Sequence, residues 1–266
     1  VTVQWLLRTL GLDRYIGRMR YWPKTEAGER AHKMHANYLS DYEEDGIFFE
    51  ERFLHHFFIY LRFPDPKILA RLHDFHLLPK RYQTHMLKTH RKVIQKMQYL
   101  NRQPNVYYLS KEVTSHTKLN DLARYYPDAK FIVNVRPSQQ FISSLLALLQ
   151  VSILVKSGVD LSELTWLSNS IIDCMRGDCQ TLWAFLDQLP RSRQHQVAFS
   201  QLNADTALVV EQIYRFLDLT ISSQYRQFLA SIDREQGQRQ QHYQYHQGHY
   251  DGFDDYDKRI LLGDMP

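Results

Sequence analysis

The clearest pattern along the chain is a change from a short apolar run to helical spacing near residue 136. Residues 131–135 are apolar except for Asn134, and Arg136 follows them directly. A short run of β-branched and aromatic residues of this kind predicts a buried strand. Apolar positions then recur with helical spacing over residues 138–156. We therefore predict a strand followed at once by a helix.

Strands and helices alternate on both sides of this point. The same patterns predict further strands at 105–111 and 195–202, and helices at 119–126, through 166–175 and at 207–219. Strands that alternate with helices are typical of a mostly parallel sheet with helices on both faces, and so of an α/β fold.

The two ends of the chain have a different character. Residues 1–104 predict mostly helix, including a long basic stretch at 67–101, and residues 233–266 predict an irregular tail rich in Gln, His and Tyr. We therefore predict one domain over 1–266, in which 105–232 forms the α/β core. A chain of 266 residues is long enough for one such domain.

Composition and charge narrow the class of protein. Apolar residues make up 44% and charged residues 23% of the chain, as in ordinary globular proteins. The net charge of +4 suits an anionic ligand but is too small to predict nucleic-acid binding by itself. The longest nearly apolar stretch, 141–155, is shorter than the roughly 20 residues that cross a bilayer. We predict that it is a buried helix.

The cysteines bear on the compartment. Cys174 and Cys179 are the two cysteines of the chain, and two thiols make no disulfide framework. No secretory signal is visible. These features predict a reducing compartment, and we expect a cytoplasmic protein.

Cationic residues follow two of the predicted strands. Lys111 ends the strand at 105–111, Arg136 ends the strand at 131–135, and Ser144 lies within the next helix. In an open parallel sheet, ligands bind beyond the carboxyl ends of the strands. The planar fork of arginine suits phosphate oxygens, and the start of a helix offers unpaired N–H groups. The pattern indicates a pocket for a multiply charged anion, although a lone arginine at a strand end is more often a surface ion-pair partner.

The block that contains these residues resembles a known family. KEVTSHTKLNDLARYYPDAKFIVNVRPSQQFISSL is similar to the core of sulfotransferases that use 3′-phosphoadenosine 5′-phosphosulfate. Their pattern is a lysine at a strand end, a short helix, the motif F-P-D-A-[KR]-F-[IV], an arginine, and a serine eight residues beyond it. In this chain Lys111, residues 126–132, Arg136 and Ser144 fill those places.

Two further segments extend the resemblance over most of the chain. QVAFSQLNADTALVVEQIYRFLDLTIS is similar to a later strand and helix of the family, and HKMHANYLSDYEEDGIFFEE resembles its acceptor-side region. The resemblance implies a P-loop NTPase-like parallel sheet flanked by helices.

The resemblance also implies roles for individual residues. Arg136 and Ser144 would hold the 3′-phosphate of the donor, and Lys111 would lie near the sulfuryl group. Lys118 stands where some members carry a basic residue, and is a weaker binding candidate. The general base would be His116 or Glu112, of which His116 has the more suitable unperturbed pKa. No metal ion is implied.

One motif of the family is not found in the sequence. A glycine-rich loop of the kind G-x-x-[RK]-[ST]-G-[TS], which would cradle the 5′-phosphosulfate, has no counterpart among the ten glycines. In relatives it would precede the position of Val1. We therefore expect the fold of this chain to be incomplete at its N-terminus.

The sequence thus predicts transfer of a sulfuryl group from 3′-phosphoadenosine 5′-phosphosulfate to a hydroxyl or amine. The expected acceptor is a small molecule, glycan or lipid, and we expect no nucleic-acid partner and no membrane span. Two alternatives stay open. One is a non-catalytic nucleotide- or partner-binding fragment of the same fold. The other is a P-loop nucleotide kinase, which would need a lysine-bearing loop and a magnesium-binding carboxylate at a strand end.

Overall fold

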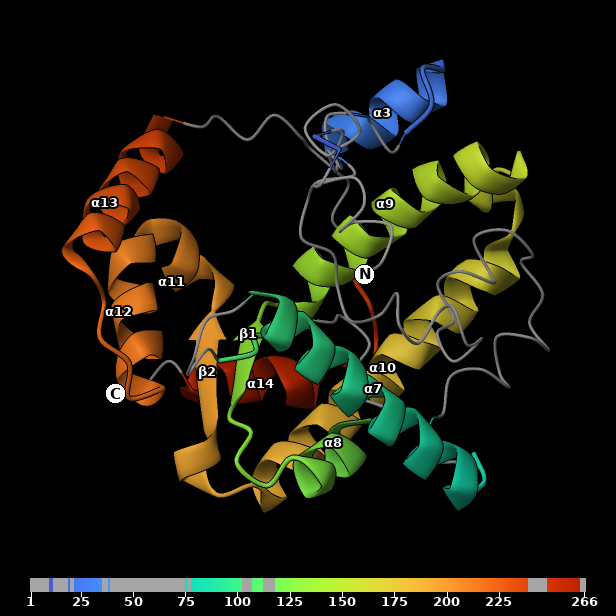
Figure 1. Ribbon diagram of the computed structural model, residues 1–266. Helices are drawn as coiled ribbons and strands as arrows, with labels where there is room; N and C mark the ends of the chain where they lie inside the picture. Colours follow the sequence, from blue (N-terminus) through green and yellow to red (C-terminus); the bar gives the residue numbers. More distant parts are fainter. Residues whose placement is uncertain are drawn as a thin grey trace. The chain divides into compact units, whose positions relative to one another are not determined.

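Helices make up most of the described chain, and two short strands form a parallel sheet (Figure 1). The structure is a computed structural model. It describes residues 10–11, 19, 22–34, 38, 75, 78–101, 107–111, 118–238 and 248–263, with backbone alone at 100–101, 233–238 and 261–263. The presence of helices together with a parallel sheet confirms the predicted α/β class, whereas the P-loop-like arrangement stays a prediction.

The sheet pairs β1 (Phe131–Val135) with β2 (Gln194–Ala198). The strands are parallel and in register from Phe131 opposite Gln194 to Val135 opposite Ala198. Parallel neighbours need a long crossover, and here helices form it. Within the described ranges these are the only two strands, and their carboxyl ends lie at the same edge.

The chain divides into two compact units, each built from separate stretches of sequence. One contains Val1–Tyr125 and Ala147–Ser170, and the other contains Tyr126–Leu146 and Ile171–Pro266. The predicted single domain, with its regions 1–104, 105–232 and 233–266, stays a prediction.

In the part of the first unit that the structure describes, helices pack through two apolar clusters. Its helices are α3 (Glu26–Met34), α7 (Lys80–Asn101), α8 (Leu119–Tyr125), the later part of α9 (Ser138–Ser157), the short 3₁₀ helix η3 (Leu161–Glu163) and the start of α10 (Thr165–Gln188). Met86 and Leu87 of α7 pack with Leu122 and Tyr125 of α8. A separate cluster around Trp22 and Ala31 joins α3 to α9. Burial of these faces stabilises the helices more than their intrinsic propensity does.

The second unit surrounds the sheet. It contains the remaining parts of α9 and α10, the 3₁₀ helix η4 (Arg191–Arg193), α11 (Phe199–Ala204), α12 (Thr206–Phe216), α13 (Ser223–Gln238) and α14 (Asp254–Gly263). Arg193 fixes the entry to both strands, because it donates to the carbonyl oxygens of Tyr126 and Ala129 while its guanidinium lies over Phe131.

Helix α9 is the longest apolar element. By length and composition alone it could cross a membrane, as could the core helix of a soluble protein. Ile142, Leu149 and Ile153 are almost completely buried within the protein. Most of the other side chains of α9 are half-buried, so the buried helix predicted from sequence stays a prediction.

Two predicted strands differ from the structure. Residues 107–111 form no strand, and Tyr107 and Leu109 are exposed. A strand is stable only against a neighbour, and these residues have no ladder partner among those described. The strand predicted at 195–202 stops at Ala198, after which Phe199–Ala204 is helical.

The irregular tail predicted over 233–266 is also wrong in part. Helix α13 continues to Gln238, and α14 follows at Asp254–Gly263. Three aspartates occupy the first turn of α14, where the helix dipole favours negative charge. Tyr256 and Ile260 lie four residues apart and are both buried, which gives the short helix one apolar face.

Candidate functional site

Arg136 lies directly beyond the carboxyl end of β1 and is half-exposed. Its guanidinium carbon is 4.5 Å from the ring centroid of Phe199, the first residue after β2. Its Nε donates to Oε1 of Gln140 over 3.2 Å. The parallel register explains the first contact, because it brings the two strand ends together. The cation predicted at this edge therefore lies there in a fixed orientation.

Ser144 lies on the same face of α9 as Gln140. The two residues are four positions apart, one turn of the helix, so their side chains point in nearly the same direction. Ser144 is half-buried. Gln140 and Ser144 thus lie along one face of α9, and Arg136, which precedes the helix, contacts this face through Gln140. Gln140 was missed from the sequence, although its distance of four residues from both partners could have indicated it.

The start of α9 differs from the expectation that its N–H groups are unpaired. The backbone N–H of Ser138 donates to Oδ1 of Asp257 over 2.8 Å, and its hydroxyl donates to Oδ2 over 2.6 Å. A carboxylate at this position satisfies a helix-terminal N–H group and interacts favourably with the dipole. Asp257 therefore already occupies the end of the helix at which the sequence predicts an anion.

The serine pair in α9 has two different environments. Ser143 is buried, its Oγ lies 3.0 Å from the hydroxyl of Tyr250, and it accepts from the N–H of Gly248 over 3.1 Å. These partners come from the tail and hold it against α9. Ser143 is thus a structural contact, whereas Ser144, on the face of Gln140, is the serine that fits the predicted site.

Tyr256 holds the backbone at Arg136. Its hydroxyl donates to the carbonyl oxygen of Arg136 over 3.1 Å. Burial raises the pKa of Tyr256 well above its usual range, while the bond to Arg136 opposes the rise. The phenol therefore stays protonated and keeps donating across the range of pH in which proteins work.

The remaining predicted residues lie in the other unit or outside the described residues. Lys111 is exposed, whereas Lys118 is 2% exposed and so lies inside the first unit. His116 and Glu112 lie outside the described residues. The roles assigned to these four residues, and to Arg136 and Ser144, stay predictions.

The described residues form no metal site, and the thiol of Cys179 is not a nucleophile. Within the ranges the structure covers, no three His, Cys, Asp or Glu side chains lie close enough to hold a metal ion. Burial raises the pKa of the Cys179 thiol to about 12, and the carboxylates of Asp178 and Asp257 add to the effect. This thiol stays protonated and unreactive. Neither Cys174 nor Cys179 takes part in a disulfide.

The fold is that of an α/β protein, and the guanidinium of Arg136 lies at the carboxyl edge of its two parallel strands. Comparison with known families is more specific. The sequence profile of the sulfotransferase family matches residues 23–223, well over half of the chain. The chain therefore belongs to the sulfotransferase family, and the resemblance noted in the sequence is confirmed. A search of curated proteins and a search of solved structures each found no match.

Proposed function

We propose that this sulfotransferase-family protein moves a sulfuryl group from 3′-phosphoadenosine 5′-phosphosulfate to a hydroxyl or amine of its acceptor. Family membership supports transfer in general. The observation that carries the choice of donor is the position of Arg136 at the strand edge, with Gln140 and Ser144 along the adjacent face of α9.

Arg136 and Ser144 bind the 3′-phosphate of the donor in this proposal. The Phe199 ring lies beneath the guanidinium and Gln140 holds its Nε, so the planar fork is oriented before the ligand arrives. An oriented fork loses less entropy on binding than a mobile one. A hydroxyl two turns into the helix supplies a further donor to a phosphate oxygen.

The chemistry is an in-line displacement at sulfur. The acceptor oxygen or nitrogen forms a bond to sulfur while the bond between sulfur and the bridging oxygen of the donor breaks. His116 or Glu112 takes the acceptor proton, and Lys111 offsets the negative charge that grows on the departing phosphate. Lys118 is a weaker candidate for a donor contact. Cationic side chains neutralise the developing charge, so the proposed reaction uses no metal ion.

We further propose a P-loop-like core and a cytoplasmic location. Parallel strands joined through helices support the first. The two cysteines, which form no disulfide and of which Cys179 is buried and unreactive, support a reducing compartment.

The binding role of Arg136 is tested by titration calorimetry with adenosine 3′,5′-bisphosphate. The variant Arg136→Ala is expected to weaken binding by about 1.5–3 kcal/mol, as for loss of hydrogen bonds to a charged group. Arg136→Lys keeps the charge but loses the fork, and is expected to bind with intermediate affinity. Arg215→Ala removes an exposed arginine of the same unit and is the control. Unchanged affinity in Arg136→Ala would remove this residue from the site.

A non-catalytic nucleotide-binding role is the second candidate. The Asp257 carboxylate takes the Ser138 N–H and so weakens the positive potential that the start of α9 would offer to a reacting phosphosulfate, whereas Arg136 is still oriented for a phosphate that does not react. Transfer of labelled sulfuryl from the donor to a panel of hydroxyl and amine acceptors distinguishes the two. Nucleotide binding that depends on Arg136, without transfer to any acceptor, would support the second candidate.

A further inference from the structure

Asp257 places a negative charge beside the proposed phosphate site at Arg136. Its Oδ1 accepts from the backbone N–H of Ser138 over 2.8 Å, and its Oδ2 accepts from the Ser138 hydroxyl over 2.6 Å. Tyr256, the preceding residue, donates to the carbonyl oxygen of Arg136 over 3.1 Å. Two successive residues of α14 therefore hold the chain on both sides of Pro137, and the carboxylate lies next to the turn that carries Arg136.

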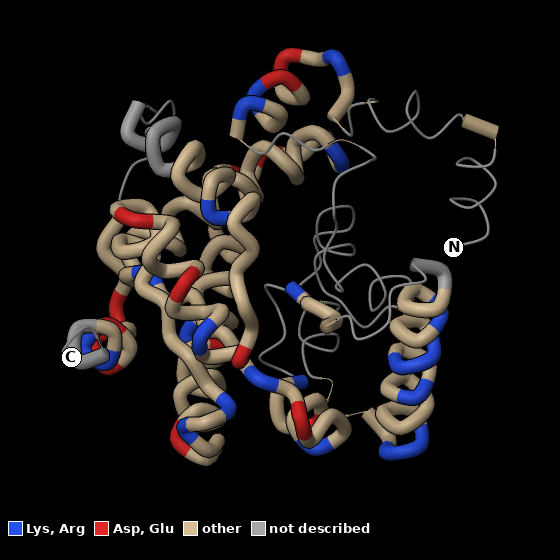
Figure 2. The backbone as a smooth tube through the Cα atoms, turned by 60° about the vertical axis from the view of Figure 1, so that its left-hand side comes forward, with Lys and Arg blue, Asp and Glu red and all other residues tan. Residues whose placement is uncertain are grey.

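The cations that follow Asp257 in α14 are paired with other carboxylates. Lys258 Nζ lies 3.9 Å from Oδ1 of Asp255, and Arg259 forms a bidentate ion pair with Asp187 at 3.0–3.1 Å. In Figure 2 basic and acidic residues follow one another along this short helix, beside the C-terminus. Asp257 itself forms no ion pair with a described residue. Within the described residues its charge is offset by the start of α9, whose dipole is equivalent to about half an elementary charge, and not by a cation.

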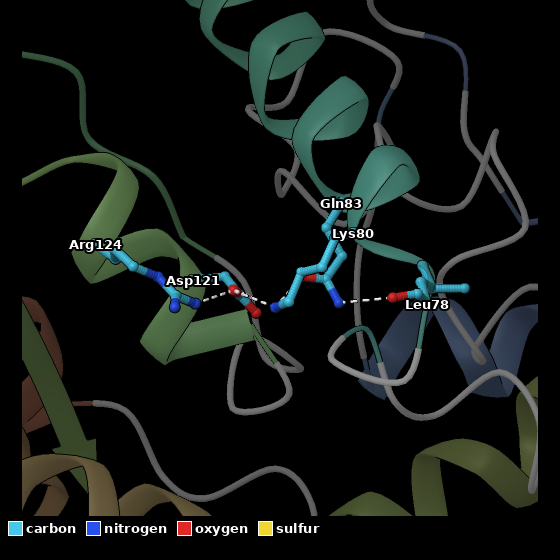
Figure 3. Close-up of polar contacts among 5 residues, drawn as sticks. All are labelled: Leu78, Lys80, Gln83, Asp121 and Arg124. Carbon is cyan, nitrogen blue, oxygen red and sulfur yellow. Dashed lines mark hydrogen bonds and ion pairs between the residues drawn. The ribbon is translucent and has the colours of Figure 1, made fainter.

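Asp121 shows how the same chain holds a carboxylate whose charge is balanced (Figure 3). It is buried and accepts from Arg124, and Lys80 Nζ lies 4.0 Å from the same carboxylate oxygen. Two cations therefore lie near Asp121, whereas the described donors to Asp257 are a neutral N–H group and a neutral hydroxyl. An anion that approaches Arg136 thus meets a negative charge that no described cation neutralises.

The charge of Asp257 acts on neighbouring groups of the second unit. Burial is the main cause of the raised pKa of Tyr256 and of Cys179, and the carboxylate of Asp257 adds to both. A charge that disfavours ionisation of a phenol and a thiol also disfavours a phosphate close by. Ser138 lies within about 7 Å of Arg136 along the backbone, because two residues span no more than that. Charges at such separations are only partly screened at physiological salt.

We propose that Asp257 forms an autoinhibitory contact: α14, docked on the start of α9, repels the phosphate that Arg136 binds. Docking of α14 and binding of the nucleotide then oppose each other. The inference rests on the proposed function, since it names a regulation of the proposed nucleotide site. Coupling of this kind is reciprocal, so the bound nucleotide weakens the docking of α14 by the same factor. A partner that moved α14 would raise the affinity for the nucleotide.

A residue that only caps the helix would act in the opposite direction. Such a residue fixes the backbone at Arg136, helps binding, and weakens the affinity when it is lost. An autoinhibitory charge strengthens the affinity when it is removed. Asp257→Asn separates the two effects, because the amide keeps an oxygen that accepts from the Ser138 N–H but carries no charge.

The test is titration calorimetry of Asp257→Asn with adenosine 3′,5′-bisphosphate at low salt. The variant is expected to bind about threefold more tightly than the wild type, or better, and the gain is expected to shrink as salt is raised. Asp254→Asn removes an exposed aspartate from the same turn of α14 and is the control. Its affinity is expected to stay within about twofold of the wild type, because a solvent-exposed charge is screened.

Two results would overturn the proposal: an affinity of Asp257→Asn equal to or lower than that of the wild type, and an equal gain in Asp254→Asn. If neither the wild type nor Asp257→Asn binds the nucleotide, the proposed function is overturned instead, and thermal unfolding in sodium phosphate at constant ionic strength decides on Asp257. Autoinhibition then predicts that phosphate raises the melting temperature of Asp257→Asn more than that of the wild type. Adding Arg136→Ala to Asp257→Asn is expected to remove the difference. Equal shifts in the wild type and Asp257→Asn would overturn the autoinhibitory contact as well.

Discussion

At the scale of single residues, burial changes what a side chain does. His195 lies within β2, and its ring stacks on Phe216 with 5.2 Å between the centroids. Its Nε2 is buried and has no hydrogen-bond partner among the described residues. Burial lowers the pKa of this histidine below its ordinary value of 6.5. The folded protein therefore keeps His195 neutral at a pH at which the unfolded chain already binds a proton.

This difference predicts a pH dependence of stability. As pH falls through 6.5 the unfolded state takes up the proton first, so the contribution of His195 to stability is present above that pH and is lost below it. We expect the free energy of unfolding in urea to fall less between pH 7.5 and 5.5 in His195→Gln than in the wild type. His85→Gln changes an exposed histidine and should keep the wild-type fall. Equal falls in all three proteins would contradict the prediction.

At the scale of elements, α9 connects the strand edge to the tail. Its start is capped by Asp257, its Ser143 contacts Tyr250 and Gly248, and its Gln140 holds Arg136. The helix thus positions the candidate phosphate site on one face while the tail packs on another. Arg136 is two residues before Ser138. A change in the backbone conformation at the start of α9 is therefore expected to shift the position of Arg136.

Removal of the cap tests this connection. Asp257→Ala leaves the N–H and hydroxyl of Ser138 without their acceptor, and is expected to lower the free energy of unfolding by about 1–2 kcal/mol. Asp254→Ala removes another aspartate from the first turn of α14, exposed to solvent, and accounts for the charge effect on α14 itself. Urea denaturation measures both. A loss in Asp254→Ala as large as that in Asp257→Ala would show that the bond to Ser138 contributes nothing.

At the scale of the whole molecule, the last described residues complete the core of the second unit. Phe253 is 2% exposed, packs edge-to-face against Phe141, and lies beneath the guanidinium of Arg176. Gly252 precedes it with a φ of 82°, a conformation that favours glycine and turns the chain into α14. The tail is therefore part of the folded unit.

Truncation of Phe253 tests the role of the tail. Phe253→Ala is expected to cost about 3–5 kcal/mol, because it leaves a cavity against Phe141 and removes the ring beneath Arg176. Phe228→Ala, at a position that is 55% exposed, is the control and should change stability little. Thermal or urea unfolding gives the comparison. A tail that only covers the surface would give similar small losses in both.

Patterns within single segments of the sequence were sufficient to predict several helices and strands and to predict the family. The strand at 131–135, the helix from Ser138, and the helix around Thr206–Phe216 were predicted because each has an apolar period of its own. The place of Arg136 followed from the end of its strand, and the motif around it led to the sulfotransferase family, which the family match confirms. The spacing of eight residues from Arg136 distinguished Ser144 from Ser143. Ser143 contacts Tyr250, and the binding role of Ser144 stays a prediction.

Contacts between distant segments were decided only by the tertiary structure. Asp257 is 119 residues from Ser138, and Phe199 is brought beneath Arg136 by the parallel register of β1 and β2. Residues 107–111 form no strand because no described segment pairs with them, and this too depends on which segments meet in the folded chain. A hydrogen-bond cap, a cation–ring contact and a strand pair each need two segments to meet. Sequence patterns report the periodicity within one segment, and only folding of the whole chain determines which segments become neighbours.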